Sequence, residues 1–287
     1  MARRPFDKLM SAASQRSHRH HFAHAANFGR GFAGAVIFGL PLMMTMEMWW
    51  LGFTLNGWML LQFALLNLAL LVALSRVSGF DESRGITEDI LDALAAFGMG
   101  SIVSAALLGL FAEIASSTPL PEIAGMIVIQ AVPASFGAMI ADKLFGEDDK
   151  SGEHRARRRS YAGQLTLMVA GALFLSFTMS PTEEIALISF RMTPWHALAT
   201  MVISIAAMHV LVYSVGFAAH RTDDRGAGLS VLLRFTMVGY GLAVLASAYI
   251  LWTFGRLDGL GWAAAAQMII VLALPAGIGA AIARMVV

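Results

Sequence analysis

The stretch Asn56–Arg76, which reads NGWMLLQFALLNLALLVALSR, decides the fold. Its only charged side chain is the arginine at its last position. A membrane-spanning α-helix needs about 20 predominantly apolar residues to cross a hydrocarbon core of about 30 Å. This stretch therefore predicts a transmembrane helix, and windows of the same kind recur along the chain at 31–53, 56–76, 90–112, 122–145, 161–189, 195–219, 229–254 and 260–286.

The composition of the 287-residue chain agrees with a membrane protein. Apolar residues make up 57% before glycine is counted, charged residues make up 14%, and cysteine is absent. Soluble domains have about 45–50% apolar residues with glycine included and about 25% charged ones, so too few polar residues exist here to coat a globule. The composition excludes a soluble enzyme, a nucleic-acid binder and a secreted disulfide scaffold. A membrane β-strand would alternate polar and apolar residues over about ten positions, and no window does so, which predicts an all-α, polytopic fold with about eight spans.

The positions of lysine and arginine predict the orientation. Eighteen of the 20 lie in or beside segments 1–30, 77–89, 146–160, 220–228 and the C-terminal end, and only Arg191 and Arg256 fall elsewhere. Under the positive-inside rule this bias places both termini in the cytoplasm. Residues 1–28 form a basic tail and residues 147–160 a charged linker, and we expect both to contact anionic lipid.

The linker lies near the midpoint of the chain, and the two halves share residues at nearly constant offsets. The matched pairs are Glu47 with Glu184 and Trp58 with Trp195 at an offset of 137, and Pro133 with Pro275 and Gly137 with Gly279 at an offset of 142. This pattern predicts two four-helix repeats, 29–146 and 161–287. Because four spans is an even number, the repeats would be parallel and related by an axis along the membrane normal.

Of the carboxylates inside the predicted spans, three are the first candidates for a functional site. They are Glu47, Glu183 and Glu184. A carboxylate at the centre of a span costs about 2.5–3.5 kcal/mol on insertion scales, so it needs a partner, a proton or water. We expect these acids to bind a cation, Ca²⁺, Na⁺ or H⁺, in the outer half of the bilayer, with no other cofactor. The alternative is that they reach the headgroups, since Trp49 and Trp50 mark an interfacial belt beside Glu47.

Other polar residues are weaker candidates. His209, Gln130 and Asn67 are candidates for a pathway or proton relay, although a lone histidine or amide in a span also serves as interhelical glue. Glu113 and Glu122 flank a connection predicted to lie outside, where acids would raise the local cation concentration at a mouth. A solvated loop explains these two acids equally well.

Four prolines lie inside or beside spans and are candidate hinges. Each lacks a backbone N–H and so frees a carbonyl of the preceding turn. Those beside the acids are Pro41 and Pro181, whose freed carbonyls could help to bind a cation, and those in the fourth and eighth spans are Pro133 and Pro275. The latter two are followed by small residues that let helices approach closely, which favours packing or a hinge over ion binding.

Several motifs are absent. The chain has no HExxH, GxSxG or GxxxxGK sequence, so we expect no enzymatic activity, and no span carries regularly spaced arginines. The leading hypothesis is a cation channel or cation/proton exchanger, which in a homo-oligomer could form a ring of glutamates. The alternative is a non-transporting membrane scaffold, lipid-binding or sensor protein.

Two sequence blocks also carry a family resemblance. They are Thr45-Met-Glu47 with Trp49-Trp50, and Ser180-Pro-Thr-Glu-Glu184 with Trp195 behind it. With the four-plus-four layout of spans, the chain after residue 28 resembles the DUF2391 family of bacterial integral membrane proteins. The resemblance implies a multi-span protein of the bacterial inner membrane and does not by itself imply an activity.

Overall fold

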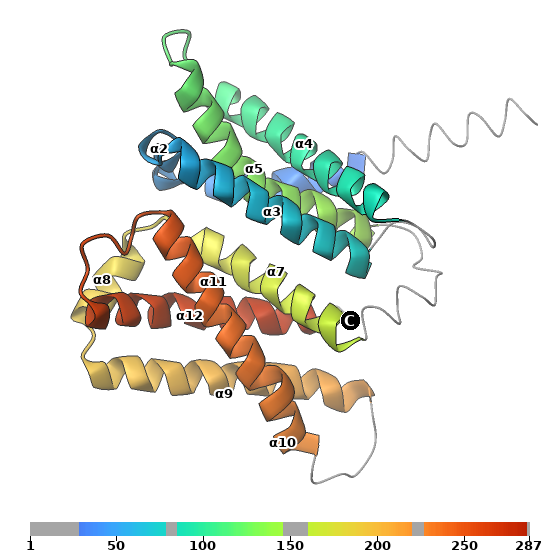
Figure 1. Cartoon of the computed structure of the whole chain (residues 1–287), viewed down its shortest axis with the longest axis vertical. Helices are drawn as coiled ribbons and strands as arrows, with labels where there is room; N and C mark the ends of the chain where they lie inside the picture. The colour runs from blue at the N-terminus through green and yellow to red at the C-terminus, as the bar shows by residue number, and fades with distance from the viewer. Residues whose placement is uncertain (1–28, 79–84, 146–159, 220–226, 286–287) are drawn as a thin grey trace, which may run out of the picture.

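The computed structural model describes residues 29–78, 85–145, 160–219 and 227–285, and these residues form helices and short connections without a strand (Figure 1). This confirms the all-α prediction. The tail 1–28 and nearly all of the charged linker lie outside the described residues, so their contact with anionic lipid stays a prediction. After a first helix, Gly29–Met43, come α2 (Met46–Thr54), α3 (Gly57–Ser78), α4 (Ile86–Leu110), α5 (Leu120–Phe145), α7 (Tyr161–Met179), α8 (Glu184–Arg191), α9 (Pro194–Ala219), α10 (Ala227–Val231), the π-helix η1 (Leu232–Met237), α11 (Val238–Thr253) and α12 (Trp262–Met285).

Seven described helices are long and apolar enough to cross a membrane, with α10, η1 and α11 together making one of them. An eighth span results if Gly29–Met43 and α2 are taken together, but their axes differ by 86°. The uninterrupted helices expected at 31–53 and 161–189 are therefore wrong in their bounds. A proline accompanies each break. Pro41 lies two residues before the first break, and Pro181 lies in the turn between α7 and α8.

One helix is central in each half of the chain. In the first half α5 contacts α2, α3 and α4, and in the second α12 contacts α7, α8, α9 and α11. Glycines allow the closest approaches. A Cβ atom added to Gly137 would lie 2.4 Å from the carbonyl oxygen of Gly34, and one added to Gly279 would lie 2.3 Å from that of Gly171. The small residues after Pro133 and Pro275 thus pack backbone against backbone, as expected.

Phenylalanines fill the interface between the two halves. The ring of Phe63 on α3 packs edge-on against those of Phe177 on α7 and Phe254 after α11, with centroids 5.4 and 5.6 Å apart. Phe136 on α5 also meets Phe177, at 5.9 Å. The halves are therefore joined by an apolar aromatic cluster at α3, α5 and α7.

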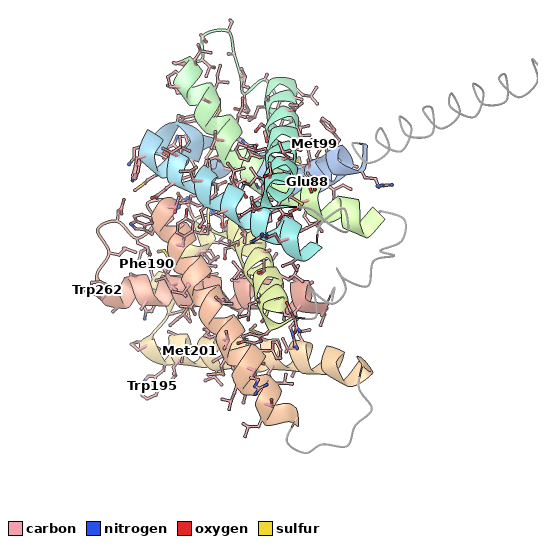
Figure 2. The ribbon with its side chains drawn as sticks, turned by 45° about the vertical axis from the view of Figure 1, so that its right-hand side comes forward. Glu88, Met99, Phe190, Trp195, Met201 and Trp262 are labelled. Atoms are coloured by element: carbon pink, nitrogen blue, oxygen red, sulfur yellow. The ribbon has the colours of Figure 1, made fainter. Side chains whose placement is uncertain are left out.

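All tryptophans lie at one end of the helix bundle, here called the tryptophan end. This end holds α2, α8, the starts of α3, α9 and α12, and the end of α11 (Figure 1). Figure 2 labels Trp195, Trp262 and Phe190, all three on this side of the molecule. Tryptophan gathers at membrane interfaces, which predicts that this end lies at headgroup level. The six residues are Trp49, Trp50, Trp58, Trp195, Trp252 and Trp262.

Candidate functional site

The three predicted ion-binding glutamates lie at the breaks between helices, at the tryptophan end. Glu47 is half-buried in the first turn of α2, Glu184 is the exposed first residue of α8, and Glu183 is the exposed residue before it. Glu47 and Glu184 thus both lie in the first turn of the short helix that follows a break. The pKa of Glu184 is lowered, first because its carboxylate accepts a hydrogen bond from its own backbone N–H, and second because the Thr182 hydroxyl donates to it.

The remaining predicted acids share this end of the bundle. Glu113 lies in the connection between α4 and α5, and Glu122 in the first turn of α5, and both are half-buried. Among the described residues, no three His, Asp or Glu side chains come together in a group that could hold a metal ion. The acids therefore make a charged surface at one end of the molecule rather than a compact chelating site.

The four candidate hinge prolines divide into two kinds. Pro41 and Pro181 accompany the two breaks, whereas Pro133 and Pro275 lie inside α5 and α12, which continue across them. Each missing N–H leaves a carbonyl one turn earlier without its usual partner. The first pair shapes the tryptophan end, and the second pair lies in the two central helices.

The predicted pathway amides are buried in the interior of the first half. Gln130 on α5 is fully buried, and neither its amide nitrogen nor its amide oxygen has a hydrogen-bond partner. Asn67 on α3 donates through Nδ2 to Ser135 Oγ at 3.2 Å, but its Oδ1 has no partner. Ser135 in turn donates to the carbonyl of Val132. An enclosed polar atom without a partner costs about 1–3 kcal/mol, so these amides are expensive unless something binds them.

A small cavity lies beside Asn67 at the interface of the two halves. Its volume is about 10 Å³, close to the least that holds one water molecule. Four helices contribute to its wall, namely α3, α5, α7 and α11, through Phe63, Leu66, Asn67, Leu70, Phe136, Leu173, Phe177 and Tyr249. Asn67 is the one amide on this otherwise mostly apolar wall.

The interior also holds hydroxyl groups that the sequence did not single out. Ser176 on α7, Ser180 directly after α7 and Ser247 on α11 are buried, and their Oγ atoms have no partner. Near them in the chain, Arg256 donates to the carbonyl of Pro181, while its Nε is enclosed without a partner. The spacing of four between Ser176 and Ser180 was an available signal, since it places both on one face of a helix.

His209 meets a different partner from the amides. Its Nδ1 lies 3.0 Å from the hydroxyl oxygen of Thr236, which is fully buried in η1. Short π-helical turns are rare and occur frequently at functional sites. The contact joins α9 to η1 inside the second half.

A buried carboxylate lies at the opposite end of the bundle. Asp89 in the first turn of α4 accepts from Arg76 Nε at 3.0 Å and from the Ser75 hydroxyl at 3.3 Å. The same hydroxyl lies 3.3 Å from a carboxylate oxygen of Asp92. These contacts tie the end of α3 to the start of α4, which explains Asp89 and Asp92 as structural residues.

Comparison of the chain with models of known protein families finds one match. A family model described as "Putative integral membrane protein (DUF2391)" matches residues 27–287. No curated protein and no solved structure matches the chain. The match covers every helix described above and agrees with the apolar spans, so the chain belongs to the DUF2391 integral membrane protein family.

Proposed function

We propose that the protein is an ion-permeation protein of the bacterial inner membrane, a cation channel or cation/proton exchanger without enzymatic activity. In this proposal both termini lie in the cytoplasm and the two halves are parallel four-helix repeats. Glu47, Glu183 and Glu184 collect cations at the tryptophan end. Interior amide and hydroxyl oxygens on α3, α5 and α7 then pass the ion through the protein.

Gln130 is the observation that carries the proposal. A glutamine with both amide atoms unpartnered is costly in a protein surrounded by lipid, because hydrocarbon supplies no hydrogen bonds. Amide and hydroxyl oxygens are ligands that replace the hydration of a small cation during permeation. Asn67 Oδ1 and the Ser176 and Ser180 hydroxyls add unpartnered oxygens on α3 and α7. A purely structural interior would be more stable with apolar side chains at these positions.

The glutamates support a collecting role at the mouth. Glu183 and Glu184 are exposed, and the lowered pKa of Glu184 keeps its carboxylate ionised at neutral pH. Exposed acids at a mouth raise the local cation concentration without holding the ion tightly. We infer that they affect the rate of permeation mainly when cations are dilute.

Flux measurements in liposomes test the proposal. The purified chain is reconstituted, and Na⁺, K⁺, Ca²⁺ and H⁺ fluxes are compared for the parent, Gln130→Leu and Asn67→Leu. Losing an oxygen worth about 1.4 kcal/mol to the permeating ion slows transfer about tenfold. Glu47→Gln and Glu184→Gln should reduce flux at low cation concentration and leave it nearly unchanged at saturation.

The matched control is Gln267→Leu. Gln267 is an amide on α12 whose Nε2 already donates to the carbonyl of Met192 at 3.2 Å. Its removal should leave flux unchanged, and the elution of each variant in size-exclusion chromatography checks that it is folded. A parent with no flux above empty liposomes for any of the four ions, or Gln130→Leu and Asn67→Leu variants as active as the control, overturns the proposal.

A non-transporting scaffold, lipid-binding or sensor protein is the second candidate, and α8 favours it. This short helix buries Ile185 and Ser189 and exposes Leu187, Ile188 and Phe190. With charged residues at both ends, it has the amphipathic character of a helix lying in the membrane interface. In this alternative Glu184 serves only to keep the start of α8 in the headgroups, and the flux experiment gives no signal.

A further inference from the structure

Arg284 lies in the last turn of α12, at the end opposite the tryptophans, and it contacts three other helical elements. Its Nε donates to Gln164 Oε1 on α7 at 2.8 Å, and its Nη1 lies 3.4 Å from the carbonyl oxygen of Val212 on α9. The guanidinium carbon lies 3.8 Å from the centre of the Phe235 ring on η1. The cation is thus held in a fixed place between α7, α9, η1 and α12.

Every protein partner of this guanidinium is neutral. Within the described residues no carboxylate pairs with Arg284, whereas Arg76 at the same end of the bundle has Asp89. Removing a charge from water without a counter-charge is unfavourable. In the part of the chain that the structure describes, the Nη2 atom makes no hydrogen bond, and the protein does not enclose it. One edge of a fixed cation therefore stays open toward the surface.

The surroundings of this open edge suit a phospholipid. Tyr161 is exposed beside it, with its ring 5.5 Å from that of Phe235 and its hydroxyl donating to the carbonyl of Arg234 at 3.1 Å. Tyrosines with one apolar and one wet end mark the headgroup level. Leu229, Leu233 and Met237 are exposed at a spacing of four along α10 and η1. They form an exposed apolar strip on the same helical stretch that carries Phe235, the ring against which the guanidinium packs.

We propose that Arg284 binds the phosphate of an anionic phospholipid. The guanidinium edge donates to the phosphate oxygens, and the acyl chains lie along the strip of Leu229, Leu233 and Met237. Arginine matches phosphate oxygens well because its planar N–H groups can donate in pairs. Basic pockets between membrane helices are known binding places for anionic headgroups. The site is separate from the amides and glutamates of the proposed permeation pathway, and it is independent of whether ions move.

Lipid binding to delipidated protein in neutral detergent tests the proposal. Phosphatidylglycerol, phosphatidylcholine and inorganic phosphate are added in separate titrations, and bound lipid is counted by native mass spectrometry. The parent should bind phosphatidylglycerol well above phosphatidylcholine, and this preference should weaken as salt is added. Arg284→Gln should reduce phosphatidylglycerol affinity about tenfold, the loss expected for one charge-assisted contact. Arg284→Lys, which keeps the charge, should retain more than half of the bound lipid.

The control is Arg191→Gln, which removes an exposed arginine at the tryptophan end. It should bind phosphatidylglycerol as the parent does. Equal affinity of the parent and Arg284→Gln overturns the proposal. Millimolar inorganic phosphate that displaces phosphatidylglycerol fully from the parent indicates a free-anion site and also overturns it. If Arg284→Gln does not fold, the lipid preference and salt dependence of the parent and the binding by Arg284→Lys decide the question.

Discussion

The crossing of α7 and α12 at Gly171 and Gly279 yields a prediction that the distances define closely. A Cβ atom on Gly279 would lie 2.3 Å from the carbonyl oxygen of Gly171 and 3.0 Å from its carbonyl carbon. Carbon and oxygen atoms in close backbone contacts are ordinarily about 3.3 Å apart. Gly279→Ala therefore requires the two helices to separate locally by about 1 Å. The obstacle is backbone, so no rotamer change relieves it.

The expected destabilisation follows from two opposing terms. Overpacking costs about 1–3 kcal/mol, and the higher helix propensity of alanine returns up to about 1 kcal/mol. Close packing matters more in lipid than in water, because lipid tails are as apolar as the side chains and association depends on van der Waals contact. We expect Gly279→Ala to lower the free energy of unfolding by about 1–2 kcal/mol. Gly171→Ala, whose Cβ would lie 2.2 Å from the Gly279 carbonyl oxygen, should behave alike.

The assay is unfolding in mixed micelles with increasing dodecyl sulfate, followed by tryptophan fluorescence. Gly241→Ala on α11 is the control, since no atom lies within 4 Å of its added Cβ. It should be neutral or stabilising. Because Gly171 and Gly279 oppose each other, the double variant should lose less than the sum of the single losses. A Gly279→Ala protein that unfolds at the same dodecyl sulfate fraction as Gly241→Ala, or strict additivity in the double variant, refutes the reasoning.

Three further predictions concern the ion pair of Asp89, the ionisation of Glu184 and the depth of the tryptophans in the membrane. Asp89→Asn removes the partner of the half-exposed Arg76 and should cost about 1 kcal/mol in the same unfolding assay, with a smaller loss at high salt; an unchanged midpoint at low salt would contradict it. The carboxylate of Glu184 has a pKa below its ordinary value of 4.5 and stays mostly ionised down to that pH. The flux difference between the parent and Glu184→Gln should therefore stay constant from neutral pH down to pH 4.5. A flux difference that disappears near pH 6 would contradict the lowered pKa of Glu184. Fluorescence of the six tryptophans should be quenched best by lipids brominated near the headgroup. Strongest quenching by lipids brominated at the ends of the acyl chains would contradict the position of the tryptophans at headgroup level.

Much of the fold could be predicted from the sequence, because the hydropathy of a segment depends only on the residues within that segment. The window 56–76 and most of the other apolar windows coincide with observed helices, and helices joined by short connections make up the described parts of the chain. The errors occurred at Pro41 and Pro181. There the apolar run continues, but the helix ends within two residues of a proline and a short second helix follows; in the first half the axis of that second helix differs by 86°.

The candidate site could be predicted only in part. Gln130 and Asn67 were recognisable as polar residues within spans, but their lack of partners depends on which helices surround α5 and α3. Glu47 and Glu184 were recognisable as costly acids, yet the breaks before α2 and α8 place them at the tryptophan end. The spacing of Ser176 and Ser180 was only a weak signal, because a serine in a span usually bonds within its own helix.

Arg284 illustrates the division between sequence and tertiary structure most clearly. By itself the sequence determined that the chain lies in a membrane, that it is helical and approximately where the spans lie. Each of these depends on how many apolar residues follow one another along the chain. At that level Arg284 was only one more basic residue near a helix end. Tertiary structure decided that neutral groups from α7, α9 and η1 surround its guanidinium, and that Gln130 is enclosed without a partner. The physical reason is that burial and pairing depend on neighbouring helices distant in the chain, which no local sum of hydropathy contains.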